Sequence, residues 1–328
     1  MGKYILKRIA LMALTFFIIF TICFFLIRAL PVPLIAAPGA DGEEIARQFR
    51  ERNHYNDPLL LQYFYFFQRL FTASDGGNFG YSFQIEWLAK PWELMVSRFP
   101  PTVLINIYTM IFAVPIGLGL GVFMALRKNK IEDHVLSVLI MLFISVPSFV
   151  YAFLVQYLFG SVWGILPLKM EAVARFDGNW FHPDMFVSML PAIISMSFGT
   201  IAGFARYTRA ELTEVITSDF MLLARTKGLT RTQATLRHAF RNSLVPIFPM
   251  ILGEFIGILS GSVIIESIFA VNGIGGLFLE SITKRDYDVF LFVGMFYVLI
   301  GLVGGLIIDL SYGIVDPRIR MGGKKSGQ

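Results

Sequence analysis

The sequence predicts an all-α membrane protein with six transmembrane helices and both termini in the cytoplasm. Of its 328 residues, 55% are hydrophobic and only 16% are charged, whereas soluble domains carry about 25% charged residues. Uncharged stretches also recur at the length of roughly 20 residues that a helix needs to span a bilayer. This composition excludes a disordered chain, and the single cysteine, Cys23, excludes an internal disulfide or a cysteine-based zinc site.

Six segments reach the length of a membrane span. They are residues 9–27, 99–126, 135–168, 185–205, 242–265 and 289–308, and among them only 242–265 contains a charged residue, Glu254. The first segment follows basic residues, as a signal peptide would. Its 19 residues exceed the apolar core of about 7–15 residues typical of signal peptides, which favours a retained span.

The distribution of basic residues sets the orientation, because cytoplasmic loops of membrane proteins are enriched in Lys and Arg. With the N-terminus inside, the inner segments hold 17 of the 28 Lys and Arg residues and a net charge of +11, against −4 outside. We therefore expect a multi-pass protein of the bacterial cytoplasmic membrane. The flanking charges account for the basic balance of the chain without a nucleic-acid partner.

The long outer segment, residues 28–98, contains two expected helices. Asp41 can cap a short charged helix that runs through Arg52. The aromatic-rich stretch 59–71 predicts a helix on the bilayer surface, with a docking surface for an outer partner as the alternative. Residues 74–82 are rich in turn formers.

The inner loop between the fourth and fifth spans, residues 206–241, is far longer than a connection requires. Ser218 can cap a helix, Gly228 can end it, and Thr230 with Gln233 can form a capping box for a second helix. The pattern predicts a helix, a glycine turn and another helix.

Such a loop suits a helix that fits into a groove on a cytosolic partner. Ala224 and Gly228 are four residues apart and share one small face, while Phe220, Leu222 and Leu223 supply apolar anchors. Binding of the loop's cations to anionic lipid is an equal alternative. DNA binding is disfavoured because both ends of the loop are fixed to membrane spans.

The loop also resembles a known motif. Residues 219–229 (DFMLLARTKGL) and 237–246 (RHAFRNSLVP) resemble the cytoplasmic "EAA" loop of ABC importer permeases, most closely that of the dipeptide and oligopeptide branch. Shorter resemblances to this branch follow in order along nearly the whole chain: GYS at 80–82, FPPT at 99–102, LP at 190–191, ARYTR at 205–209, IESIF at 265–269 and RDY at 285–287. The general consensus of this motif is EAA-x3-G. The chain keeps only its last alanine and its glycine, as Ala224 and Gly228, and has Leu222 and Leu223 in the first two positions.

The resemblance implies a type I ABC importer permease fold and a non-catalytic subunit that forms half of a pathway for oligopeptides or dipeptides. The implied division is a first helix with an extracytoplasmic segment (1–98), a five-helix core (99–315) with a coupling loop (206–243), and a cytoplasmic tail (316–328). The implied partners are a second homologous permease, two cytosolic ATPases, an extracytoplasmic peptide-binding protein and the lipid bilayer. The sequence has no G-x4-G-K-[ST] phosphate loop, so ATP and Mg are expected on the ATPases and no cofactor on this chain.

The expected coupling segment is 219–246. Its expected ATPase contacts are Asp219, Phe220, Leu222, Leu223, Ala224, Arg225, Lys227, Gly228 and Arg231.

Two residues of the fifth span are candidates for the pathway or the permease interface, Glu254 and Ser260. An acid inside a span is a functional candidate, and Glu254 could meet a substrate amine or pair with an Arg of the second permease. Nickel complexes or other small solutes remain alternative substrates. A proton-driven secondary transporter is a further alternative, although its inverted repeat is not evident. The four histidines show no metal-ligand spacing, and no metal site is expected.

Overall fold

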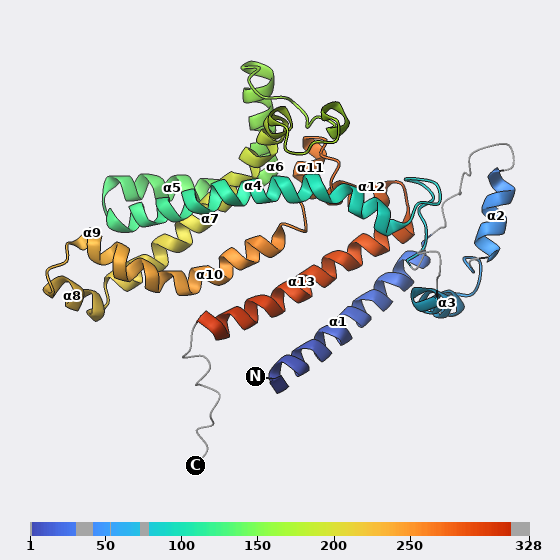
Figure 1. Ribbon diagram of the computed structural model, residues 1–328, viewed down its shortest axis with the longest axis horizontal. Coiled ribbons are helices and arrows are strands. Elements are labelled where there is room, and N and C mark those ends of the chain that lie inside the picture. The colour runs from blue at the N-terminus through green and yellow to red at the C-terminus, as the bar shows by residue number, and fades with distance from the viewer. Residues whose placement is uncertain (1, 31–41, 53, 73–78, 316–328) are drawn as a thin grey trace, which may run out of the picture. The chain divides into compact units, whose positions relative to one another are not determined.

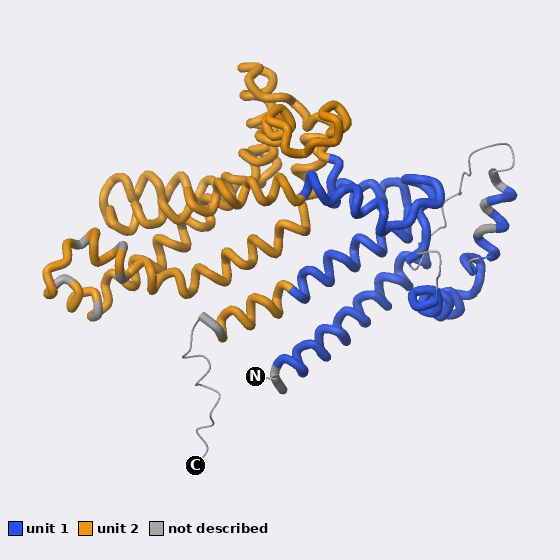
Figure 2. The backbone as a smooth tube through the Cα atoms, in the orientation of Figure 1, with its two compact units in different colours: residues 1–102, 272–303 blue, residues 103–271, 304–328 orange. Residues whose placement is uncertain are grey.

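The computed structural model describes residues 2–30, 42–52, 54–72 and 79–315, which form helices and connecting turns without a strand in these ranges (Figure 1). The chain divides into two compact units, residues 1–102 with 272–303 and residues 103–271 with 304–328 (Figure 2). The all-α prediction is confirmed. Asp41, most of the predicted turn at 74–82 and the tail 316–328 lie outside the described residues.

The first unit contains α1 (Gly2–Arg28), α2 (Gly42–Arg52), α3 (Leu59–Thr72), the start of α4 (Pro91–Leu126), α12 (Ile274–Thr283) and most of α13 (Tyr287–Val315). Phe20 and Phe24 of α1 are buried together with Phe66 of α3 and Met295 of α13. A second cluster joins α4 to α12 and α13. The predicted helices ending at Arg52 and covering 59–71 are both present.

The second unit contains the rest of α4 and α13 and ten further elements. In chain order these are α5 (Ile131–Ser145), α6 (Ser148–Val155), a π-helical turn (Gln156–Val162), a 3₁₀ turn (Val173–Phe176), α7 (Pro183–Ile216), α8 (Asp219–Thr226), α9 (Arg231–Ala234), a π-helical turn (Thr235–Ala239), α10 (Phe240–Gly257) and α11 (Val263–Ile268). Helix α7 packs against α5, α6, α10 and α11 and is the centre of this unit.

Among the residues that the structure describes, four helices are long and apolar enough to cross a membrane, and five candidate spans result if a bent pair is one span. The four are Ile5–Arg28, Pro91–Leu126, Pro183–Ile216 and Tyr287–Gly313. The sequence predicted six spans, and two of the six predicted segments are interrupted in the structure.

The predicted third span, 135–168, breaks near its middle. Helices α5 and α6 meet at an angle of 99° around Val146, whose φ of −83° and ψ of 129° are extended. Pro147 explains the break, because proline lacks an N–H for the helix and drives the residue before it out of the helical region. The absence of charged residues predicts that this segment is apolar, but it does not predict the bend.

The predicted fifth span, 242–265, is also interrupted. Helix α10 ends at Gly257, and α11 starts only at Val263. Gly261 between them has a φ of +64°, a backbone conformation that favours glycine. Ser262 then caps α11 by accepting a hydrogen bond from the backbone N–H of Ile265 at 3.4 Å, so the chain restarts a helix instead of continuing one.

Glycines bring α4 and α7 into close contact, as expected for small residues in membrane helices. A Cβ atom at Gly117 would lie 2.7 Å from the Cβ of Phe204, and one at Gly121 would lie 2.5 Å from the Cβ of Thr208. A Cβ at Gly119 would meet nothing within 4 Å. Only the two glycines that face α7 are therefore required for this packing.

Candidate functional site

The loop between α7 and α10 folds as the sequence predicts. Helix α8 is followed by Gly228, whose φ of +90° lies in the left-handed region that favours glycine at a helix end. The capping box is present in both directions: the N–H of Thr230 donates to Oε1 of Gln233 at 3.1 Å, and the N–H of Gln233 donates to Oγ1 of Thr230 at 3.3 Å. The cap predicted at Ser218 differs: its hydroxyl donates backward to the carbonyl oxygen of Val215 in α7 at 2.6 Å, and no hydrogen bond from α8 to this side chain is found among the described residues.

The loop has its own apolar core. Met221 and Ala224 of α8 are buried with Ala234 and Ala239, against Ala125 at the end of α4 and Leu212 near the end of α7. Ala224 is 8% exposed. The face that carries Ala224 therefore packs inward and fixes the loop to α4 and α7, instead of offering a small surface to a partner.

The opposite face of α8 presents apolar side chains outward. Leu222 is 63% exposed and Leu223 is 59% exposed, and Asp219, Lys227 and Gly228 are also exposed. Two adjacent exposed leucines on a packed helix form a small apolar surface that would be covered in an assembled complex. The side chains of Phe220, Arg225 and Arg231 lie outside the described residues.

A buried ion pair fixes α5 to α7 next to this loop. The guanidinium of Arg209 donates from Nε to Oδ1 of Asp133 at 2.5 Å and from Nη2 to Oδ2 at 2.7 Å. The Asp133 side chain is fully buried, and the N–H of Asn129 also donates to its Oδ2 at 3.0 Å. Such a two-point pair holds both planar groups in one orientation. Sequence reasoning counted these residues as loop charges and missed the pair, because they lie 76 positions apart.

A cavity of about 570 Å³ opens beside the break between α5 and α6. Its wall includes Pro147 and Tyr151 at the break, Gly199, Gly203 and Arg206 of α7, and Met250 of α10. Because α7 contributes to this wall and also to the core of the α8 loop, the two features share one helix.

The two residues predicted for the pathway lie elsewhere in the second unit. Glu254 is exposed on α10, and Ser260 lies in the turn between α10 and α11. Neither belongs to the wall of the 570 Å³ cavity. Their roles stay predictions, and the described residues contain no group of His, Cys, Asp and Glu that could hold a metal ion.

Two buried aspartates, Asp286 and Asp288, organise the first unit. The sequence pointed to Asp286 only as part of the motif at 285–287 and did not identify Asp288. Four donors converge on Oδ2 of Asp286: the Ser82 hydroxyl at 2.6 Å and the backbone N–H groups of Phe83, Gln84 and Ile85 at 3.0, 3.0 and 3.1 Å. Burial raises the pKa of this carboxyl above its ordinary value, although the hydroxyl and the backbone donors partly offset the effect. Asp286 thereby fixes the turn at residues 82–85.

Asp288, two residues further along the chain, makes a second set of contacts. Its Oδ1 accepts from Nη2 of Arg28 at 2.8 Å, and its Oδ2 accepts from the Tyr55 hydroxyl and from the N–H of Tyr81 at 3.3 Å. Gly80 is required here, because a Cβ would lie 2.0 Å from Oδ2 of Asp288. The separate motifs at 80–82 and 285–287 are thus two sides of one structure.

Comparison with known proteins identifies the family. Residues 117–321 match the family described as "Binding-protein-dependent transport system inner membrane component". The dipeptide transport system permease protein DppB of Lactococcus lactis subsp. cremoris is 34% identical over 98% of this chain and its own full length. The oligopeptide transport system permease protein OppB of Haemophilus influenzae is 32% identical, with 98% of this chain and 100% of OppB covered. DppB of Bacillus subtilis is also 32% identical, with 98% and 99% covered.

These matches extend over the α8 loop, the cavity and most of both units. The chain therefore belongs to the family of inner membrane components of binding-protein-dependent transport systems, and it is a multi-span, non-catalytic membrane subunit.

Proposed function

We propose that this chain is a permease subunit of an ATP-driven importer of dipeptides or oligopeptides and forms half of its translocation pathway. The relatives named for dipeptide and oligopeptide transport match it over 98% of its length. The observation that carries the coupling role is the exposed leucine pair of α8, which stands on a loop with its own packed core. A second homologous permease, two cytosolic ATPases and an extracytoplasmic binding protein complete the proposed assembly.

The fold proposed for this role is that of a type I ABC importer permease with both termini in the cytoplasm. In this proposal α5 and α6 together form one broken span, and α10 with α11 forms another. With the four long helices this gives six crossings. Broken helices at membrane depth are tolerated where they face protein or line a water-filled cavity, and the break at Val146 and Pro147 does line a cavity.

The mechanism follows from the rigidity of the loop. An ATPase that seats on Leu222 and Leu223 would move α8, and the buried core that includes Met221, Ala224 and Leu212 would transmit this movement to α7. The pair between Asp133 and Arg209 would carry α5 along. Since α5 and α7 both line the 570 Å³ cavity, movement of the loop would change its shape. ATP and Mg would be bound by the ATPases.

The coupling surface can be tested with the double variant Leu222→Glu, Leu223→Glu in the assembled transporter. Two carboxylates in place of the exposed leucines should abolish ATP-dependent uptake of a labelled dipeptide and release the ATPases during purification. Truncation or charge reversal at the centre of an interface typically costs about 2 kcal/mol or more. Since both side chains are exposed, the folding of this chain should be unaffected.

The matched control is Leu222→Met, Leu223→Met, which keeps the apolar surface and should retain the ATPases and uptake. Retention of the ATPases by the glutamate variant would refute the assignment of this surface. Uptake of a nickel complex in place of peptides would change the substrate. Uptake by this chain alone, driven by a proton gradient and lost in Glu254→Gln, would favour a secondary transporter.

A further inference from the structure

Helix α3 packs across the end of α1 at which the first span terminates. Tyr63 and Phe67 of α3 contact Phe20, Phe24 and Phe25 of α1, with ring centroids 5.1–6.4 Å apart. The Thr21 and Tyr63 hydroxyls share a hydrogen bond of 2.7 Å. Helix α3 is thereby fixed close to the boundary at which α1 leaves the membrane.

One face of α3 is apolar and exposed. Leu60 is 74% exposed, Phe64 is 63% exposed and Phe71 is 85% exposed. A helix of this kind, attached to the end of a span, lies in the membrane interface with its apolar side chains among the acyl chains. The aromatic residues are the type enriched at that depth.

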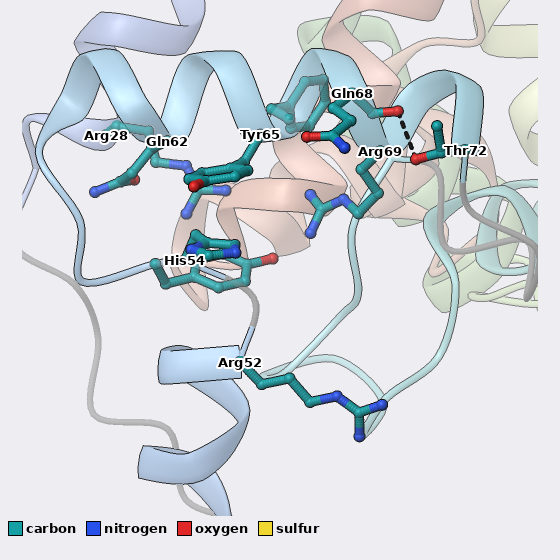
Figure 3. A pocket seen from close by; sticks show the side chains of 10 residues that line it. Arg28, Arg52, His54, Gln62, Tyr65, Gln68, Arg69 and Thr72 are labelled. Carbon is teal, nitrogen blue, oxygen red and sulfur yellow. Dashed lines mark hydrogen bonds between the residues drawn. The ribbon is translucent and has the colours of Figure 1, made fainter.

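A pocket of about 260 Å³ lies between α3, the end of α1 and the turn that precedes α3 (Figure 3). Three arginines line it, Arg28, Arg52 and Arg69, together with His54. Figure 3 shows the Arg69 guanidinium extending from α3 toward His54, whose ring stacks on that of Tyr65 at 3.6 Å between centroids. At a liquid volume of about 30 Å³ per water, the pocket has room for roughly nine water molecules.

The pocket has an excess of positive charge. Arg28 is neutralised by Asp288 at 2.8 Å, and His54 bonds to Asp57 at 2.8 Å. None of the ion pairs between described residues includes Arg52 or Arg69. The Nε atom of Arg69 is buried and lacks a hydrogen-bond partner among the described residues, while the guanidinium also hydrogen-bonds Tyr55 and interacts with the charge of Asp288. An anion in the pocket would add a charged acceptor for this guanidinium.

An apolar groove of about 480 Å³ begins at the same helix. Phe67, Leu70 and Phe71 of α3 line one end, and Phe16 and Phe17 of α1 and Leu299 of α13 line its length. Its wall is almost entirely apolar. The cationic pocket and the groove therefore share α3, whose neighbours Phe66 and Phe67 line one each.

We propose that this pair of cavities binds one anionic phospholipid, with its phosphate on Arg69 and an acyl chain in the apolar groove. The guanidinium offers parallel N–H donors that match the geometry of phosphate oxygens. Arg52 adds a second cation without a carboxylate partner among the described residues. A membrane phospholipid fits better than a free phosphate, because only the lipid has an acyl chain for the groove that α3 also lines. The site stands apart from the α8 loop and does not rest on the identity of the transported solute.

The test is native mass spectrometry of the complete transporter, purified in detergent and titrated with phosphatidylglycerol. Arg69→Gln replaces the guanidinium with a shorter, uncharged amide and should weaken binding of one lipid by about fivefold, the factor that one cation contributes near an anionic surface. The matched control is Arg175→Gln at an arginine whose side chain is 67% exposed and pairs with Glu171. This control should bind lipid as the unmodified chain does.

A second arm examines the groove and the source of the phosphate. Phe17→Ser, which places a hydroxyl in the groove wall, should also weaken phosphatidylglycerol binding while leaving the Arg69 charge in place. Unchanged lipid binding in Arg69→Gln would overturn the proposal. Displacement of the lipid by millimolar inorganic phosphate would make this a free-phosphate site. Loss of binding-protein capture in Arg69→Gln with unchanged lipid binding would make it a protein contact, and either result overturns the lipid assignment.

Discussion

Replacement of Asp286 by alanine should strongly destabilise the first unit. Four donors converge on one oxygen of this side chain at distances of 2.6–3.1 Å, and both Asp286 and Ser82 are buried. A buried donor left without its acceptor costs about 1–3 kcal/mol. Taking the lower end for each donor gives about 4 kcal/mol, and water that reaches the partly exposed backbone of residues 83–85 reduces this to about 3 kcal/mol.

Asp286→Asn should cost less than Asp286→Ala. The amide oxygen can accept the same four bonds, so the one group left without a partner is the amide nitrogen in the place of Oδ1, which has no partner among the described residues. The asparagine variant therefore separates the acceptor geometry from the charge of the carboxylate.

The pH dependence has a definite sign. Burial holds the pKa of Asp286 above its ordinary value of 3.8 in the folded chain. A raised folded pKa gives stability that is complete below the unfolded pKa and is lost as pH rises through the folded pKa. The unfolding temperature of the unmodified chain should thus fall, relative to that of Asp286→Asn, as pH rises from about 4 toward neutrality.

The assay is the temperature at which half of the detergent-solubilised protein leaves the monodisperse peak in size exclusion, at one heating rate for all variants. At 2–4 °C for each kcal/mol, a loss of about 3 kcal/mol lowers this temperature by roughly 6–12 °C. Glu93→Ala, at an acid whose side chain is 60% exposed, should shift it by less than about 2 °C. A shift for Asp286→Ala no larger than this control, or one equal for alanine and asparagine, would refute the acceptor argument.

Two further predictions concern the second unit. Gly121→Leu should lower the same unfolding temperature by an amount equivalent to about 1–3 kcal/mol, because its Cβ would lie 2.5 Å from that of Thr208. Gly119→Ala should be tolerated, because a Cβ there meets nothing within 4 Å. Equal effects of the two substitutions would contradict the close approach of α4 and α7. Arg209→Met should lower the free energy of unfolding by about 3 kcal/mol, because it leaves the fully buried Asp133 unpaired. Adding Asp133→Asn should recover part of that loss. A double variant as unstable as the single one would show that the ion pair is not the cause.

Local signals in the sequence predicted local structure well. The sequence predicted the turn at Gly228 and the capping box of Thr230 and Gln233, and both are present in the α8 loop. Each of these signals acts within a few residues of the chain. The helix predicted from the aromatic stretch at 59–71 corresponds to α3, whose last residue, Thr72, lies one residue beyond the predicted end.

Features that depend on distant residues could not be predicted in this way. Ala224 and Gly228 share a helical face by their spacing, but only the position of α4 and α7 decides that Ala224 is turned inward, while Gly228 is exposed. The contacts of Asp286 join residues more than 200 positions apart. Runs of uncharged residues likewise gave no sign of the bend at Val146, since proline alters backbone geometry without altering hydropathy.

The inward orientation of Ala224 changes what the α8 loop can do. A small exposed face would allow a partner to approach the backbone closely, but it would leave the loop weakly attached to its own chain. With Ala224 and Met221 buried against α4 and α7, a force applied at Leu222 and Leu223 is resisted by packed side chains and passes into the membrane helices. Close packing makes such a contact stiff. The leucine pair can therefore transmit movement from a partner, because Met221 and Ala224 on the opposite side of α8 are packed in the chain's own core.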